Sequence, residues 1–165
     1  MRAKLGLAVG ALALLTIAPA GRGFAADIPG IAIITPDGTT ATMTTDDLAK
    51  LPAITLPVGF ATEHGPRQAV FEGPLLWTVL DQAHAIAKGG PVRHVVGITG
   101  QDGYTATLAL GEVSPDFEGK QVIVAERMDG KQLDHPRLVV PGDKKGGRSV
   151  HDVIRIAVMP LPAAH

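Results

Sequence analysis

Short apolar runs that are rich in β-branched residues recur along the chain, and turn-forming residues separate them. Residues 30–34 form such a run, which ends at Pro36, Asp37 and Gly38, a sequence typical of a tight turn. The same combination of an apolar run and a turn signal returns several times downstream. We therefore expect strands over 30–34, 41–43, 54–60, 94–98, 104–110, 121–125, 137–140 and 150–159.

Two segments have the spacing of a helix instead. Apolar residues recur at near-helical intervals over 74–87, and Pro74 in the first turn favours a helix there. A shorter helix is expected over 46–50, where Thr44 or Thr45 can cap its N-terminus. We find no internal repeat and no linker between domains. The pattern predicts a strand-rich α+β fold in a single domain, with mixed sheets and a few short helices.

The N-terminus differs from the rest of the chain. Arg2 and Lys4 precede an apolar run over 5–18, which small residues follow. This arrangement is typical of a secretory signal peptide, and the run is shorter than the ~20 residues that a helix needs to cross a bilayer. A retained anchor is the alternative. We expect a signal peptide over 1–25, with cleavage one residue later as the close alternative, and a mature domain over 26–165 in the periplasm.

Composition and charge exclude several classes of protein. The 165 residues are 45% hydrophobic, enough for one globular domain, and the net charge of −1 argues against general electrostatic binding to nucleic acid. The absence of cysteine excludes a disulfide framework, a thiolate zinc site and a thiol nucleophile. The sequence contains no P-loop, dinucleotide-binding glycine run or nucleophile elbow, and its histidines lack metal-binding spacing.

Several short motifs follow one another in a particular order. They are Phe71-Glu72-Gly73-Pro74-Leu75, Asp102-Gly103-Tyr104, Met128-Asp129-Gly130-Lys131-Gln132-Leu133, Pro136-Arg137-Leu138-Val139-Val140-Pro141 and Gly146-Gly147-Arg148-Ser149-Val150-His151. Each is weak alone, but together, over about 45–159, the series resembles the oxidoreductase molybdopterin-binding domain. The resemblance implies a fold of the sulfite-oxidase type.

The chain departs from this family at the metal ligand. In the catalytic members a cysteine shortly before the Phe-x-Gly-Pro-Leu helix binds molybdenum, whereas the corresponding loop here, Val58 to Val70, contains none. A soft thiolate is not replaced by histidine or glutamate without a change in the electronics of the metal. We therefore expect neither bound molybdenum nor molybdenum-dependent catalysis.

The sequence is similar to small periplasmic members of this fold that lack cysteine and bind pterins. This implies a non-catalytic pterin-binding protein, with a reduced monapterin- or biopterin-like ligand. In that group the loaded protein docks on the periplasmic region of a membrane-bound signalling enzyme that makes or degrades cyclic di-GMP, and so influences biofilm formation. Two alternatives stay open: a small redox protein or subunit of a molybdopterin-type oxidoreductase system, and a domain that only packs against another protein.

A pterin is a flat bicyclic ring whose edge presents adjacent donors and acceptors, so its site needs an acceptor, a cation and a flat face. The resemblance places Arg148, Ser149 and His151 on the pterin side. Arg148 can stack on the ring or donate to its oxo group, with an ordinary surface ion pair as the alternative. Ser149 can bind the ring edge. His151 stands where the family usually has lysine, and a strand-edge histidine is the alternative.

The remaining candidates lie in two other segments. Glu63 and His64 belong to the loop that would have carried the cysteine, and either can face the vacated metal space. Glu63 can also accept from the pterin amino group, and a solvated loop is the alternative for both. Tyr104 can form a pocket wall or pack structurally. Asp102 can contact the ligand or stabilise its own turn by a hydrogen bond.

Overall fold

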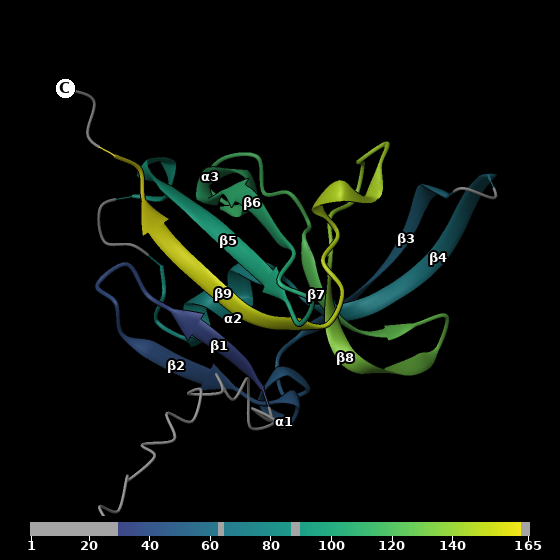
Figure 1. The fold of residues 1–165 in the computed structure, drawn as a ribbon, viewed down its shortest axis with the longest axis horizontal. Coiled ribbons are helices and arrows are strands. Elements are labelled where there is room, and N and C mark those ends of the chain that lie inside the picture. The colour runs from purple at the N-terminus through teal and green to yellow at the C-terminus, as the bar shows by residue number, and fades with distance from the viewer. Residues whose placement is uncertain (1–29, 63–64, 87–89, 163–165) are drawn as a thin grey trace, which may run out of the picture.

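A computed structural model of the protein describes residues 30–62, 65–86 and 90–162, which form two sheets with short helices (Figure 1). The expected signal peptide over 1–25 lies outside the described residues. Within the described ranges, the helices are too short or too polar to cross a membrane.

One sheet has five strands in the order β2-β1-β9-β5-β6. Its strands are β1 (Ile31–Ile34), β2 (Thr40–Met43), β5 (His94–Gly100), β6 (Thr105–Ala109) and β9 (Val153–Pro160). β1 and β9 run parallel and the other neighbours run antiparallel, so this sheet is mixed, as expected. Alternate residues such as Ile33, Ile98 and Ile156 are fully buried, because side chains alternate between the two faces of a strand.

The second sheet has four antiparallel strands in the order β3-β4-β7-β8. Its strands are β3 (Ala53–Thr62), β4 (Gly65–Pro74), β7 (Ile123–Met128) and β8 (Lys131–Val139). β3 and β4 pair along their whole length, whereas β7 pairs with β4 only at Phe71 and Glu72. The outer part of the β3–β4 hairpin therefore extends beyond the sheet (Figure 1).

The helices are short. They are α1 (Thr45–Leu48), α2 (Leu76–Gln82), α3 (Leu110–Val113) and the 3₁₀ turns η1 (Pro91–Arg93) and η2 (Gly146–Arg148). Thr44, one of the two expected caps, begins α1, and its hydroxyl accepts from the Asp47 amide at 3.1 Å. The Asp47 carboxylate in turn accepts from the Thr44 amide at 3.2 Å, which completes a capping box.

Two apolar clusters stabilise the fold. The larger cluster joins the five-stranded sheet to α2 and to parts of β7 and β8, and includes Ile33, Leu80 and Ile98. The smaller cluster lies on the four-stranded sheet and consists of Val58, Ala69, Phe71, Ile123, Ala125 and Val139, with half-buried apolar side chains around it. Three members of the smaller cluster, Val58, Phe71 and Val139, also line the pocket described below.

Some expected boundaries of helices and strands were wrong, because pairing between strands distant in the sequence decides them. The helix expected over 74–87 begins only at Leu76, since Pro74 pairs with Ala53 at the end of β4. It ends at Gln82, just before His84 adopts a left-handed backbone with φ of 53°. Within the segment expected as a loop, Val58 to Val70, the described residues 58–62 and 65–70 belong to β3 and β4.

The expected strands over 104–110 and 150–159 also begin or end elsewhere. β6 ends at Ala109, whose amide donates to the Glu112 carboxylate at 3.3 Å as α3 begins. His151 was expected to begin the last strand, but β9 starts at Val153. Asp152 has a φ of 47°, a left-handed conformation that a regular strand does not contain, and it separates His151 from the sheet.

A candidate ligand pocket beside the glycine-rich loop

A pocket lies between the β3–β4 hairpin and the segment that follows β8. It is lined by Val58, Gly59, Phe60, Phe71, Arg137, Val139, Val140, Asp143, Lys145, Gly146 and Ser149. The cavity has a volume of about 30 Å³, which is more than the roughly 10–15 Å³ that a single water molecule needs. In this conformation it does not enclose a bicyclic ligand.

Arg137 on β8 and Lys145 in the following segment are the two cations that line this pocket, and Arg137 is the more buried of the two. Its guanidinium carbon lies 5.4 Å from the centroid of the Phe71 ring, within the range of a cation–π interaction. Its Nε is buried and has no hydrogen-bond partner among the described residues. Burial lowers the pKa of Arg137, and the charge of Asp152 acts in the opposite direction. A buried N–H without an acceptor favours a ligand that brings an oxygen to it.

We define the glycine-rich loop as residues 141–149. Both of its ends are fixed, because the flanking Val140 and Val150 are buried and the Leu138 amide donates to the Val150 carbonyl at 2.8 Å. Gly142 at the start of the loop has a φ of 82°, which favours glycine. The loop supplies one wall of the pocket, and strands supply the opposite wall.

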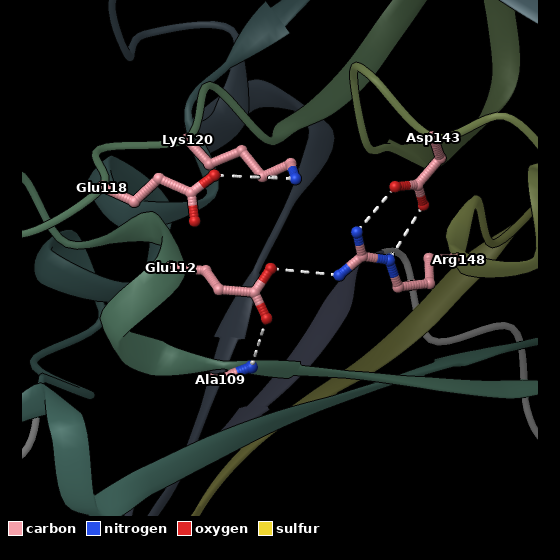
Figure 2. A network of polar contacts seen from close by, with 6 residues as sticks. All are labelled: Ala109, Glu112, Glu118, Lys120, Asp143 and Arg148. Carbon is pink, nitrogen blue, oxygen red and sulfur yellow. Dashed lines mark hydrogen bonds and ion pairs between the residues drawn. The ribbon is translucent and has the colours of Figure 1, made fainter.

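Arg148 joins this loop to α3 (Figure 2). Its Nε and Nη2 donate to the two carboxylate oxygens of Asp143 at 2.8 Å and 2.6 Å, and its Nη1 donates to Glu112 at 3.0 Å. The hydrogen bonds that Arg148 donates to Asp143 raise the pKa of Arg148 and lower the pKa of Asp143. Arg148 is thus held by two carboxylates and is not among the residues that line the pocket.

Asp102 and Tyr104 lie next to the loop rather than in the pocket wall. The Asp102 carboxylate accepts from the Tyr104 amide at 2.9 Å, which is the turn-stabilising bond given above as one of its two roles. The Tyr104 hydroxyl donates to the Gly147 carbonyl at 2.5 Å, and half of the side chain stays exposed. Tyr104 therefore contacts the glycine-rich loop from the turn that precedes β6.

Ser149 is among the residues that line the pocket, and its amide donates to the Gly146 carbonyl at 2.9 Å. His151 is exposed and is not part of the pocket lining. Partial burial and the charge of Arg137 lower the pKa of His151, while Asp152 and Asp102 raise it. Glu63 and His64 lie outside the described residues.

Sequence analysis missed Arg137 as a site residue, although its motif was recognised. The available signal is a single charged residue directly before the apolar run Leu138 to Val140. A charged side chain in a buried strand segment is uncommon and calls for a partner or a ligand. The position of Phe71 beneath it comes from the pairing of β4, β7 and β8.

No protein-family model and no curated protein sequence matches this chain. Among solved structures, the chain is similar to the sulfane dehydrogenase SoxCD from Paracoccus pantotrophus, with a TM-score of 0.63 and 19% identity. The match covers 78% of this chain and 37% of that chain. The likeness is to the fold of a molybdopterin oxidoreductase, which confirms the fold class expected from the sequence.

The residues present do not fit a thiolate-bound molybdenum. The whole sequence lacks cysteine, and in the outer β3–β4 hairpin the position of such a ligand has no soft donor. Within residues 30–62, 65–86 and 90–162, no group of three or more histidine, aspartate or glutamate side chains is placed to hold a metal ion.

Proposed function

We propose that this chain is a non-catalytic pterin-binding protein whose ligand occupies the pocket beside the glycine-rich loop. The observation that carries the proposal is the buried, unpartnered Nε of Arg137 in a pocket that also holds two aromatic side chains and the Ser149 hydroxyl. The oxo group of a pterin accepts from Arg137, and Ser149 binds the ring edge. Phe60 and Phe71 supply apolar, flat surface for the bicyclic ring.

The fold supports this ligand class, because it resembles that of a molybdopterin oxidoreductase. The absence of cysteine supports binding of the organic pterin without molybdenum. A reduced pterin of the monapterin or biopterin type is the ligand we propose. Loss of the thiolate leaves the protein to bind and report the pterin rather than to use it in redox chemistry.

We further propose that the mature protein acts in the periplasm. The pattern of the N-terminal sequence supports export, and the small size of the domain suits a soluble component of a larger system. In this proposal the pterin-loaded protein binds the periplasmic region of a membrane-bound signalling enzyme that controls cyclic di-GMP.

Anaerobic calorimetric titration of the processed protein with 7,8-dihydrobiopterin and with biopterin tests the ligand. We expect saturable binding at micromolar concentration or tighter for the reduced form. The absence of binding to either compound overturns the proposal. Elemental analysis of protein purified from its native host is the second measurement, and stoichiometric molybdenum contradicts a non-catalytic role.

A further inference from the structure

We propose that the glycine-rich loop is a gate over the pocket, held closed by a latch that consists of the Arg148–Glu112 ion pair and the Tyr104–Gly147 hydrogen bond. This inference rests on the proposed function, because it assigns control of ligand entry to the same pocket. Arg148 is then a positioning residue, which acts by holding the loop.

The need for a gate follows from the size of the cavity. Its volume of about 30 Å³ is far below the roughly 300 Å³ at which small-molecule pockets begin. The wall formed by β3, β4 and β8 is built from hydrogen-bonded strands that belong to one sheet. The opposite wall is the loop, which stands between the α3–β6 side of the domain and the β3–β4 hairpin (Figure 1). Displacement of the loop is therefore the route that enlarges the pocket.

The ends of the loop are fixed and lie side by side. Val140 and Val150 are buried, and the bond from the Leu138 amide to the Val150 carbonyl joins the two flanking segments. Such closed-ended loops move over a fixed base while the surrounding fold stays intact. Lys144, Lys145, Gly146 and Gly147 are exposed, so these four loop residues are not packed into the core.

The polar contacts of the loop fall into two groups. Those within the loop are the paired bonds between Arg148 and Asp143 and the bond from Ser149 to Gly146, so this part can move as a unit. The hydrogen bonds and ion pairs that cross from the loop to the rest of the described domain are the two latch contacts.

The two latch contacts are weak enough for the loop to open. The side chains of Arg148 and Glu112 are 33% and 29% exposed, so water replaces part of the interaction when the pair separates. The Ala109 amide holds Glu112 in place on α3, ready to re-form the pair. Loss of either latch contact should raise the open population by about three- to tenfold, because each 1.4 kcal/mol corresponds to a tenfold change.

The absence of cysteine allows a direct test that needs no pterin. Val139 lines the pocket and is 1% exposed, so a thiol introduced by Val139→Cys reacts with a maleimide only when the pocket opens. We expect labelling about three- to tenfold faster when Glu112→Gln or Tyr104→Phe is added. Glu118→Gln, which alters a nearby carboxylate that pairs with Lys120, is the matched control and should leave the rate unchanged.

A second reporter separates gating from global unfolding. Val96→Cys places a thiol in the core of the five-stranded sheet, where labelling reports unfolding of the domain. Its rate should not change with the latch variants. In addition, 0.5 M NaCl should accelerate labelling at position 139 in the otherwise unaltered chain, but much less with Glu112→Gln, because salt screens the ion pair. Equal acceleration at both reporters, or none at position 139, overturns the gate whether or not a pterin binds.

Discussion

The guanidinium of Arg137 lies over the ring of Phe71, 5.4 Å from its centroid, and the Nε of the same guanidinium is buried without a hydrogen-bond partner. The first contact stabilises the cation, while the second leaves a donor that water no longer satisfies. Uncompensated polar groups of this kind concentrate at functional sites, where a ligand completes them. Changes at Arg137 should therefore affect ligand binding much more than stability.

Arg137→Met should separate these two effects. Removal of a partly buried cation offsets the loss of the cation–π contact, so the free energy of unfolding should change by no more than about 1 kcal/mol. Affinity for 7,8-dihydrobiopterin should fall at least tenfold, since a charged hydrogen bond contributes about 1.5–3 kcal/mol. Calorimetry and thermal unfolding measure the two quantities. Arg155→Met is the control and should keep full affinity, because it changes an exposed side chain of β9.

Ser149→Ala tests the second polar contact proposed for the ligand. The hydroxyl contributes about 1 kcal/mol, so the dissociation constant should rise by about fivefold. Stability should change by less than about 0.5 kcal/mol, because no hydrogen bond of this hydroxyl occurs within the described structure. Calorimetric titration of the variant measures the dissociation constant. An unaltered value means that Ser149 does not belong to the binding site.

Asp102 should behave as a turn residue rather than a ligand contact. Asp102→Ala deletes the acceptor of the Tyr104 amide and should lower the free energy of unfolding by about 0.5–1.5 kcal/mol. Asp102→Asn keeps an oxygen at the same position and should retain most of the stability. Pterin affinity should stay the same in both variants. A selective loss of affinity in Asp102→Asn, measured by titration, contradicts this assignment.

The sequence was sufficient where neighbouring residues decide the structure. The Asp129-Gly130 turn between β7 and β8 was expected, and both residues have the positive φ that a two-residue hairpin turn requires. Thr44 caps α1 for a similarly local reason. By contrast, the prediction that Pro74 lies in a helix was wrong. Pro74 pairs with Ala53, and the local pattern contains no sign of this long-range contact.

Some residues of the candidate site could likewise be predicted from the local sequence, and others could not. Ser149 was expected to bind the ring edge of a ligand; it lines the pocket, and its contact with a ligand stays a prediction. The carboxylates that bind Arg148 come from its own loop and from α3, and the second of these, Glu112, has no local signal that would connect it to the loop. The role of Arg137 depends on burial against Phe71, which the separate motifs of the sequence do not reveal.

Gly73 should tolerate no side chain, unlike a glycine in the loop. A Cβ at Gly73 would lie 2.2 Å from the Val124 carbonyl oxygen and 2.8 Å from the Ala125 Cα, both of which are backbone atoms of β7. Gly73→Ala should therefore destabilise the domain by several kcal/mol, about 3 or more, or prevent folding. Gly146 has open space around it, so Gly146→Ala should cost less than about 1 kcal/mol. Denaturant titration compares them, and similar stabilities contradict the packing argument.

The last prediction concerns pH and His151. Its pKa in the folded protein is lowered by partial burial and then by the charge of Arg137, relative to the ordinary value of 6.5. As the pH falls through 6.5, the unfolded chain binds a proton before the folded protein does, so stability decreases until the lower, folded pKa is passed. His151→Gln should flatten this decline in the melting temperature.

The cause of that shift can be tested separately. Two effects lower the pKa of His151, namely partial burial and the charge of Arg137. Arg137→Met removes the second of these and leaves Asp152 and Asp102, which raise the pKa. NMR titration of the His151 ring should therefore give a higher pKa in Arg137→Met than in the unaltered protein. An unchanged or lower value means that the charge of Arg137 does not reach His151, and the predicted coupling between the pocket cation and the pH response is then wrong.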